Sequence, residues 1–152
     1  MSGVGTRLSA RALRTRWFVR APIGLYRAGL GFVFGSRLLM LEHAGRSTGA
    51  RRFVVLEVVD HPAPGQYVVI SGFGIGAQWY QNIQADPRVK VSIGLRRSMP
   101  ATATPMTDAE SATVLAHYIE HHPKEWEKLH ATIEYAVGRS VDTLPMVSLR
   151  TA

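Results

Sequence analysis

The chain has 152 residues, of which 46% are hydrophobic and 19% charged, a size and composition that suit one folded domain. It contains no cysteine, which excludes disulfides, thiolate nucleophiles and cysteine-based zinc or iron–sulfur sites. The net charge is +7, but residues 1–52 carry ten arginines against the single acid Glu42, whereas residues 53–152 carry eight basic and ten acidic groups. The positive field therefore lies in the first third of the chain, where it favours anionic partners.

Residues 1–35 form a basic segment, in which Pro22 and Arg27 precede the apolar stretch Ala28 to Phe34 and Arg37 follows it. Because charges and proline interrupt the apolar residues, we predict neither a signal peptide nor a membrane-spanning helix. We expect a helix that either packs on the main domain or lies on an anionic membrane surface. The expected location is the cytoplasm, with peripheral contact at the inner face of the membrane as the open alternative.

Residues 36–152 are expected to form the main domain, because the sequence pattern there changes from helical to extended. Runs rich in β-branched residues are separated by turn residues at 45–49, 61–65 and 86–87, and such short connections favour antiparallel neighbours. The predicted strands are Leu38 to His43, Arg51 to Asp60, Gln66 to Ser71, Arg88 to Leu95, Pro100 to Thr104 and Leu144 to Leu149.

Two helices are predicted before the last strand. Thr107 and Glu110 match a capping box, and Pro123 should end the first helix after His122. A second helix is expected from Pro123 to about Gly138. The last strand would return to the sheet and cover its open edge. These elements predict an α+β fold with a mostly antiparallel, closed sheet.

A first candidate binding segment is the turn Gly45-Arg46-Ser47-Thr48-Gly49-Ala50-Arg51-Arg52. Glycines allow a tight reversal with exposed N–H groups, the two hydroxyl side chains add donors, and guanidinium groups pair with phosphate or carboxylate. A solvated hairpin tip has the same composition. On spacing alone, an anion site and a plain turn are equally good interpretations.

A second candidate segment is Ser71-Gly72-Phe73-Gly74-Ile75-Gly76-Ala77-Gln78-Trp79-Tyr80-Gln81-Asn82. Its glycines would let a ligand approach the backbone, and the helix that follows would place Trp79 and Asn82 on one face. Its glycine spacing matches neither the dinucleotide fingerprint nor a P-loop. The structural alternative is that Trp79 is a core residue and Asn82 a helix-end cap.

The order of these pieces resembles the deazaflavin-dependent nitroreductase family, which binds coenzyme F420. The resemblance covers about residues 36–150 and implies a split β-barrel, related to FMN-binding oxidases, with flanking helices and the cofactor in a surface groove. It rests on Gly45-Arg46-Ser47-Thr48-Gly49 with Arg52, on Ser71-Gly72, and on the run that contains Trp79-Tyr80, Asn82-Ile83, Ala85, Pro87, Val89 and Val91.

The resemblance also implies which residues hold the cofactor. The phosphate and polyglutamate tail would be contacted by Arg46, Ser47, Thr48, Gly49 and Arg52. The deazaflavin and its linker would be contacted by Ser71, Gly72, Gln78, Trp79 and Asn82. The implied activity is hydride transfer from the reduced deazaflavin to a small electron-poor acceptor, such as a quinone, an activated alkene or a nitro compound. FMN is the alternative cofactor.

Two positions depart from the better-known members of that family. A cationic residue stands beside their serine, where this chain has Gly72. Their substrate pocket uses tyrosines after a proline near the C-terminus, whereas Pro123 here is followed by Trp126 and, further on, Tyr135. We take Trp126 and Tyr135 as the candidate substrate-pocket residues.

Two other functions remain open from the residues. His117 and His121 match an H-x-x-E-H pattern and could hold a metal from one helix face, although solvated histidines are the default interpretation. A non-catalytic barrel that binds a cofactor or a lipid fits the same fold. Nucleic-acid binding is not expected, because no aromatic and basic interleaved surface is recognisable. The sequence leaves the oligomeric state open.

Overall fold

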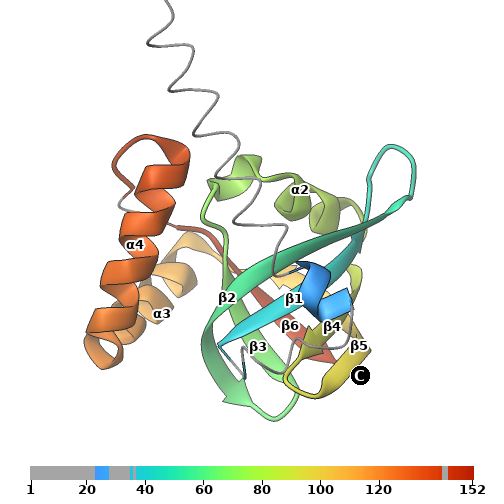
Figure 1. Ribbon diagram of the computed structural model, residues 1–152, viewed down its shortest axis with the longest axis horizontal. Helices are drawn as coiled ribbons and strands as arrows, with labels where there is room; N and C mark the ends of the chain where they lie inside the picture. Colours follow the sequence, from blue (N-terminus) through green and yellow to red (C-terminus); the bar gives the residue numbers. More distant parts are fainter. Residues whose placement is uncertain (1–22, 28–34, 36, 142–143) are drawn as a thin grey trace, which may run out of the picture.

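The computed structural model describes residues 23–27, 35, 37–141 and 144–152. Six strands close into an antiparallel barrel in the order β1-β2-β3-β6-β5-β4, with β4 paired to β1 (Figure 1). The predicted α+β fold with a closed antiparallel sheet is confirmed. The elements are β1 (Leu38–Ala44), β2 (Arg51–Ala63), β3 (Gln66–Ile70), η2 (Gly74–Gly76), α2 (Gln78–Ala85), β4 (Arg88–Ile93), β5 (Arg96–Pro105), α3 (Asp108–His121), α4 (Pro123–Val137) and β6 (Met146–Thr151).

Alternation along the strands builds the barrel core. Leu39 and Leu41 of β1 point inward, and the same alternation on the other strands adds aliphatic side chains such as Val69 and Val91. The four named side chains are fully buried, and each contributes about 1.5–3 kcal/mol through removal of apolar surface from water. The inside of the barrel is therefore a packed core.

Several strand boundaries differ from the prediction; β6, for example, is Met146–Thr151 rather than Leu144 to Leu149. At two places the reason is a turn that is shorter than expected. β2 continues through His61 and Pro62 to Ala63, which pairs with Gln66, so the β2–β3 turn is Pro64 and Gly65 alone. Register shifts in this part of β2 accommodate the proline, which cannot donate to a regular ladder. The prolines and glycine at 61–65 therefore predicted a longer turn than the structure has.

The second difference lies between β4 and β5. Ile93 pairs with Arg96, so Gly94 and Leu95 form a two-residue turn where the sequence predicts strand. Gly94 has φ 59°, a left-handed conformation that glycine adopts without steric cost. Leu95 is 85% exposed; its apolar side chain made this turn look like part of the strand.

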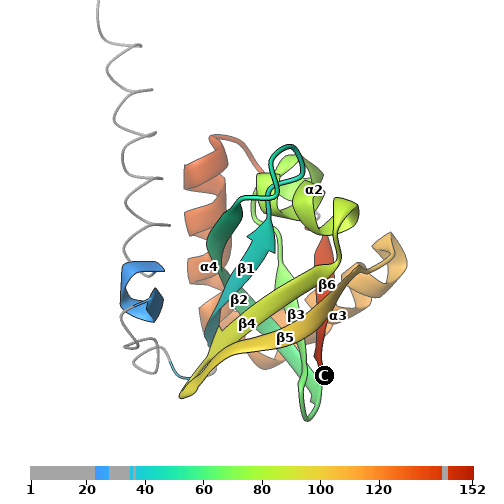
Figure 2. The same cartoon turned by 90° about the vertical axis from the view of Figure 1, so that its right-hand side faces the viewer.

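Helices α3 and α4 pack against one side of the barrel over a second apolar cluster (Figures 1 and 2). The predicted capping box is present: the Glu110 N–H donates to the Thr107 hydroxyl at 3.1 Å, and the Thr107 N–H donates to the Glu110 carboxylate at 3.0 Å. Pro123 occupies the first turn of α4, where its missing N–H costs nothing. Both predicted helices are therefore confirmed.

Helix α2 lies over one end of the barrel. Trp79, Tyr80 and Ile83 turn into the same apolar cluster as the strand side chains, and each is buried to 6% exposure or less. The end of the barrel is therefore closed by aromatic and aliphatic side chains of α2. Asn82 of the same helix is also buried, next to the turn that joins β1 to β2.

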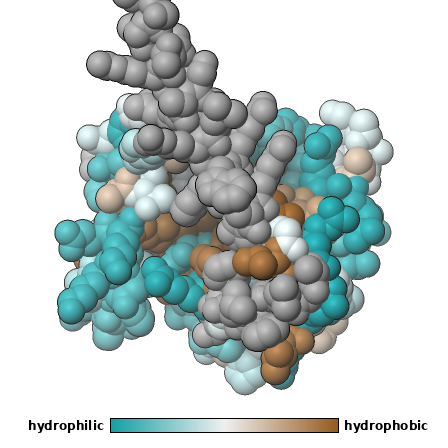
Figure 3. Space-filling view, in the orientation of Figure 1, coloured by the Kyte–Doolittle hydropathy of each residue, from teal (hydrophilic) through white to brown (hydrophobic). Residues whose placement is uncertain are grey.

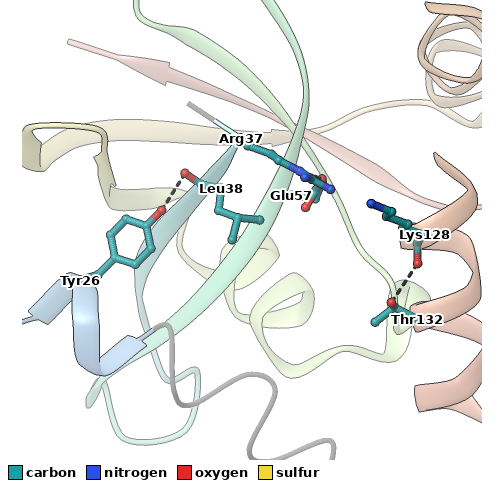
Figure 4. Close-up of polar contacts among 6 residues, drawn as sticks. All are labelled: Tyr26, Arg37, Leu38, Glu57, Lys128 and Thr132. Atoms are coloured by element: carbon teal, nitrogen blue, oxygen red, sulfur yellow. Dashed lines mark hydrogen bonds and ion pairs between the residues drawn. The ribbon is translucent and has the colours of Figure 1, made fainter. Parts of the chain in front are cut away.

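Part of the basic N-terminal segment is described. Residues 23–27 are helical, and the Tyr26 hydroxyl donates to the Leu38 carbonyl at 2.8 Å (Figure 4). The Arg27 guanidinium lies 4.8 Å from the centre of the Phe53 ring. These contacts place residues 23–27 against β1 and β2. The expected membrane-surface helix otherwise falls on residues outside the described ones. Within the described residues, none of the helices is both long and apolar enough to span a bilayer.

Candidate functional site

The turn between β1 and β2 presents donors that suit an anion. Residues 46–50 are exposed, and the N–H groups of Ser47 and Thr48 form no hydrogen bond within the described part of the chain. The Thr48 hydroxyl accepts from the Ala50 N–H at 3.2 Å and keeps its own proton to donate. Two N–H groups and two hydroxyls are therefore available to a ligand.

Other N–H groups of the turn are used internally. The Gly45 N–H donates to the Ala50 carbonyl at 2.8 Å, and the Gly49 N–H donates to the Gly45 carbonyl at 2.7 Å. Gly45 also allows a close approach by Arg52, because a Cβ at residue 45 would lie 3.2 Å from the Arg52 Nε. The glycines thus shape the turn and seat the Arg52 side chain beside it.

Asn82 joins this turn to α2. Its side-chain oxygen accepts from the Arg46 N–H at 3.2 Å and from the Arg46 guanidinium Nη1 at 2.8 Å. Its amide nitrogen lies 3.1 Å from Nδ1 of His43. Since the oxygen is committed to Arg46, the amide donates and the His43 Nδ1 accepts. A side chain 3% exposed therefore connects two segments that are 36 residues apart.

His43 is the part of this network that the sequence did not single out. It is 5% exposed and pairs with Arg52 across the β1–β2 ladder. Burial, followed by the nearby positive charge of Arg52, lowers the pKa of His43 to about 4. The ring is therefore neutral at pH 7 and can accept from Asn82. The inward alternation of Leu39, Leu41 and His43 is the signal in the sequence that could have identified it.

Ser71 holds the glycine-rich loop. Its side chain is fully buried, and its hydroxyl donates to the Gly74 carbonyl at 2.7 Å. The Gly74 N–H donates back to the Ser71 carbonyl at 3.1 Å. Residue 71 therefore shapes the loop from beneath, and the loop surface near Gly74 and Gly76 stays open, because a Cβ at either position would meet nothing within 4 Å.

Gly72 lies directly under α4. A Cβ at residue 72 would lie 3.1 Å from Cγ1 of Ile133, closer than an ordinary van der Waals contact. A longer side chain at this position would require Ile133 of α4 to shift. The departure from the family pattern at Gly72 therefore has a packing reason in this chain.

The two α2 residues predicted at the cofactor differ in exposure. Gln78 is exposed at the start of the helix. Trp79 is 6% exposed and belongs to the barrel core, with its ring edge-on to Tyr80 at 5.9 Å between centroids. Trp79 is thus mainly a core residue, which is the alternative that the sequence left open. Gln78 is exposed and can contact a ligand.

The candidate substrate residues both lie on α4. Trp126 is half-buried and stacks on His130 with 4.8 Å between ring centroids, whereas Tyr135 is 49% exposed. Nine residues make two and a half helical turns, so these two side chains point to opposite faces of α4. Trp126 faces the apolar cluster under the helices, and apolar surface is visible between the hydrophilic exterior of α4 and the barrel (Figure 3).

A cluster of polar side chains lies between the barrel and the helices. The Arg37 Nε donates to the Glu57 carboxylate at 3.1 Å, and Lys128 of α4 points toward this pair (Figure 4). Burial raises the pKa of Glu57, against the opposing effect of Arg37. Burial and the adjacent Glu57 raise the pKa of Tyr118 to about 12. This cluster connects β2 to α3 and was not predicted from the sequence.

The structure adds no third ligand, within its described residues, to the candidate metal site at His117 and His121. His117 and His121 stack on the exposed side of α3 with 4.0 Å between ring centroids, and the His121 Nδ1 lies 2.9 Å from the His117 carbonyl. Among residues 23–27, 35, 37–141 and 144–152, no three His, Cys, Asp or Glu side chains are grouped to hold a metal ion.

Solved structures share the fold at low sequence identity. A chain described as a domain-swapped dimer is 21% identical with a TM-score of 0.54, and the match covers 76% of this chain and 81% of that one. An F420-H2 dependent reductase, FDR-A, is 20% identical with a TM-score of 0.52, covering 75% and 94%. A protein of the pyridoxinephosphate oxidase family from Clostridium acetobutylicum is 8% identical with a TM-score of 0.53, covering 84% of each chain.

A family match is more specific than these shared folds. The family model described as F420H(2)-dependent quinone reductase matches residues 17–146. No curated protein matches the chain. The matched range includes the β1–β2 turn, the glycine-rich loop and α2, and it begins within the basic segment rather than at residue 36. The chain therefore belongs to the F420H2-dependent quinone reductase family of oxidoreductases, and its cofactor is coenzyme F420.

Proposed function

We propose that this reductase catalyses the two-electron reduction of an electron-poor acceptor, which is a quinone, an activated alkene or a nitro compound. When bound, the reduced deazaflavin supplies a hydride to the acceptor, and a proton from water completes the reduction. The chain itself binds both partners, orients them and keeps water from the contact between them.

One observation carries this proposal. The bonds from Arg46 to Asn82, at 2.8 and 3.2 Å, hold the β1–β2 turn beside α2 and the loop that precedes it. The two segments proposed to hold the two ends of one cofactor are thus adjacent in space, although 36 residues separate them in sequence. This arrangement supports a single elongated binding surface.

The donor set fits the anionic part of the cofactor. The exposed Arg52 side chain and the free hydroxyl and N–H groups of Ser47 and Thr48 would bind the phosphate and the start of the polyglutamate tail. Gly49 would let the tail approach the backbone. Arg46 would contribute charge while its guanidinium stays bonded to Asn82.

The deazaflavin would rest against the glycine-rich loop. Gln78 and the open surface at Gly74 and Gly76 would contact it directly, and Gly72, whose Cα faces Ile133, would contact it through its backbone alone. Ser71, Trp79 and Asn82 are buried and would support that surface from below. The exposed Gln78 amide would donate a hydrogen bond to negative charge that develops during reduction.

Titration of the purified protein with oxidised coenzyme F420, FMN and zinc tests the cofactor site. We expect micromolar deazaflavin binding by fluorescence, weakened at least tenfold in Arg46→Ala and Arg52→Ala. The exposed Arg139→Ala serves as a matched control and should bind like the parent chain. Saturation by FMN alone would contradict the proposal, and stoichiometric zinc that is lost in His117→Ala would move the site to α3. Reduction of a quinone, an alkene and a nitro compound by the loaded enzyme would then rank the acceptors.

The division of the chain at residue 35 is a further part of this proposal. If residues 36–152 form the complete cofactor-binding domain, removal of residues 1–35 leaves the deazaflavin affinity unchanged. A loss of affinity would contradict the division and agree with the family match that begins at residue 17. Pelleting of both versions with anionic liposomes would decide whether the basic segment contacts a membrane.

A further inference from the structure

A groove of about 560 Å³ crosses the outer face of the barrel beside the β1–β2 turn. Helices of the described residues leave the outer face of β4 and β5 uncovered (Figure 2). The groove belongs neither to the glycine-rich loop nor to α2. Its lining comes from β1, the β1–β2 turn and β2 with Glu42, His43, Ala44, Gly49 and Arg51, from β4 and β5 with Arg88, Val89, Lys90, Pro100, Ala101 and Thr102, and from β6 and the residue after it with Arg150, Thr151 and Ala152.

The strand register explains the shape of this groove. Val89, Ala101 and Thr151 form a row across β4, β5 and β6, and Val89 and Ala101 point inward, so the floor there is mainly backbone. The rows on either side point outward and form the walls. Since the walls are two residues apart along each strand, they are separated by roughly 7 Å. The groove crosses the four neighbouring strands β1, β4, β5 and β6, which gives it a length of roughly 14 Å. The groove thus suits an extended chain.

The two walls differ in charge, because Glu42 of β1 faces Lys90 across the β1–β4 ladder and so shares its wall. One wall carries Lys90, opposite Pro100 in the register, and the other carries Arg88 and Arg150, both opposite Thr102. With Arg51 there are four cations in the lining, against the Glu42 carboxylate. A carboxylate at Ala152 would still leave the lining positive.

Ion pairs account for half of these cations. Arg51 bonds Glu42 at 2.8 Å and Arg88 bonds Asp86 at 3.0 Å. In the described ranges, neither Lys90 nor Arg150 has an acidic side chain within ion-pair distance. These two lie on opposite walls of the groove, where a ligand with several negative groups would contact both.

We propose that this groove binds an elongated anion that carries several carboxylates, with Lys90 and Arg150 as its main contacts. Such an anion has two sources. It is either the polyglutamate tail of the bound cofactor, continued beyond the β1–β2 turn, or a separate polycarboxylate. The first source rests on the proposed function, and the second does not.

The test uses charge reversal on the full chain. The variant Lys90→Glu/Arg150→Glu reverses the two groove cations that form no ion pair with the described acidic side chains, and Lys90→Gln/Arg150→Gln repeats the test with a smaller change. The control Arg96→Glu/Arg139→Glu alters two exposed arginines outside the groove lining. Binding is measured at low ionic strength for hexa-γ-glutamate, for the deazaflavin without glutamates, for the cofactor with a long tail, and for a single-stranded oligonucleotide. Circular dichroism checks the folding of each variant.

The expected result is at least a tenfold loss of hexa-γ-glutamate affinity in both groove variants and none in the control. A parallel loss for the long-tailed cofactor, with unchanged affinity for the deazaflavin without glutamates, assigns the groove to the tail. Unchanged cofactor affinity assigns it to a separate polycarboxylate. Equal losses in groove and control variants, no hexa-γ-glutamate binding, or tighter binding of the oligonucleotide would overturn the proposal. Failure of the deazaflavin without glutamates to bind the parent chain would instead contradict the proposed function.

Discussion

The β1–β2 turn and the glycine-rich loop are held in place by different interactions. The turn is fixed by a polar side chain from another element, since Asn82 bonds Arg46 and lies against the buried His43. The loop is fixed by its own residue Ser71 and by apolar packing of Ile133 over Gly72. The turn is therefore positioned by hydrogen bonds from a distant element, and the loop by its own hydrogen bonds together with steric fit against α4.

This difference separates residues that contact a ligand from residues that position those contacts. In the turn, the buried Asn82 leaves the exposed donors of residues 47 and 48 free. In the loop, the buried Ser71 and the close approach at Gly72 leave the open surface at Gly74 and Gly76 free. Each segment thus has a buried support and an exposed surface, and substitution of the supports tests the comparison.

The largest effect is expected for Asn82→Ala. Its removal leaves the buried Nδ1 of His43 without a donor and opens a small cavity, so we expect a loss of about 3 kcal/mol in the free energy of unfolding. Urea denaturation measures it. Gln84→Ala, an exposed position on the same helix, should cost a few tenths of a kcal/mol. Similar losses for the two variants would mean that the turn does not depend on Asn82.

A smaller effect is expected for Gly72→Leu. The new side chain would run into Ile133, and such overpacking costs about 2 kcal/mol. Gly76→Leu is the matched control, because a Cβ there meets nothing within 4 Å. If steric fit holds the loop, Ile133→Ala should partly restore the stability of Gly72→Leu in a double-mutant cycle. Additive losses would argue against contact between the two positions.

The pH dependence of stability tests the polar side of the comparison. The pKa of His43 is lowered to about 4 in the folded protein, below its ordinary value of about 6.5, so protonation favours the unfolded chain. The stability that the neutral ring contributes is complete above about pH 6.5 and is lost as the pH falls toward 4. We expect a loss of about 2 kcal/mol between pH 7 and pH 5.

Urea denaturation across this pH range measures that loss. The control is His43→Gln, which keeps an acceptor for Asn82 but does not titrate, and its stability should change less between pH 7 and pH 5. If the parent chain and the variant have the same pH profile, His43 is not held neutral by its surroundings.

The smallest effect is expected for Ser71→Ala. Loss of the hydroxyl leaves the Gly74 carbonyl without that donor, at a cost of about 1 kcal/mol, and faster hydrogen exchange of the loop amides should accompany it. In the turn, Ser47→Ala should leave stability unchanged, because the Ser47 side chain is exposed and forms no hydrogen bond in the described part of the chain. An equal loss at both serines would remove the distinction between support and surface.

Local patterns in the sequence predicted most of the fold. Alternating β-branched residues identified the strands, and Thr107, Glu110 and Pro123 located the two helices near the C-terminus. Two of the predicted strand boundaries that differ lie at short turns. There the conformation of Gly94 and the bulged path of β2 around Pro62 depend on pairing with a neighbouring strand, which local composition does not contain.

The sequence by itself determined the barrel elements, the concentration of arginine and the two segments that bear the family motifs. The tertiary structure alone decided that Asn82 bonds Arg46, that His43 is buried and neutral, and that Ile133 fills the space above Gly72. It also brought Lys90 and Arg150 to opposite walls of one groove. The physical reason is that periodicity fixes the face on which a side chain lies, whereas its partner is set by the register and packing of elements distant in sequence.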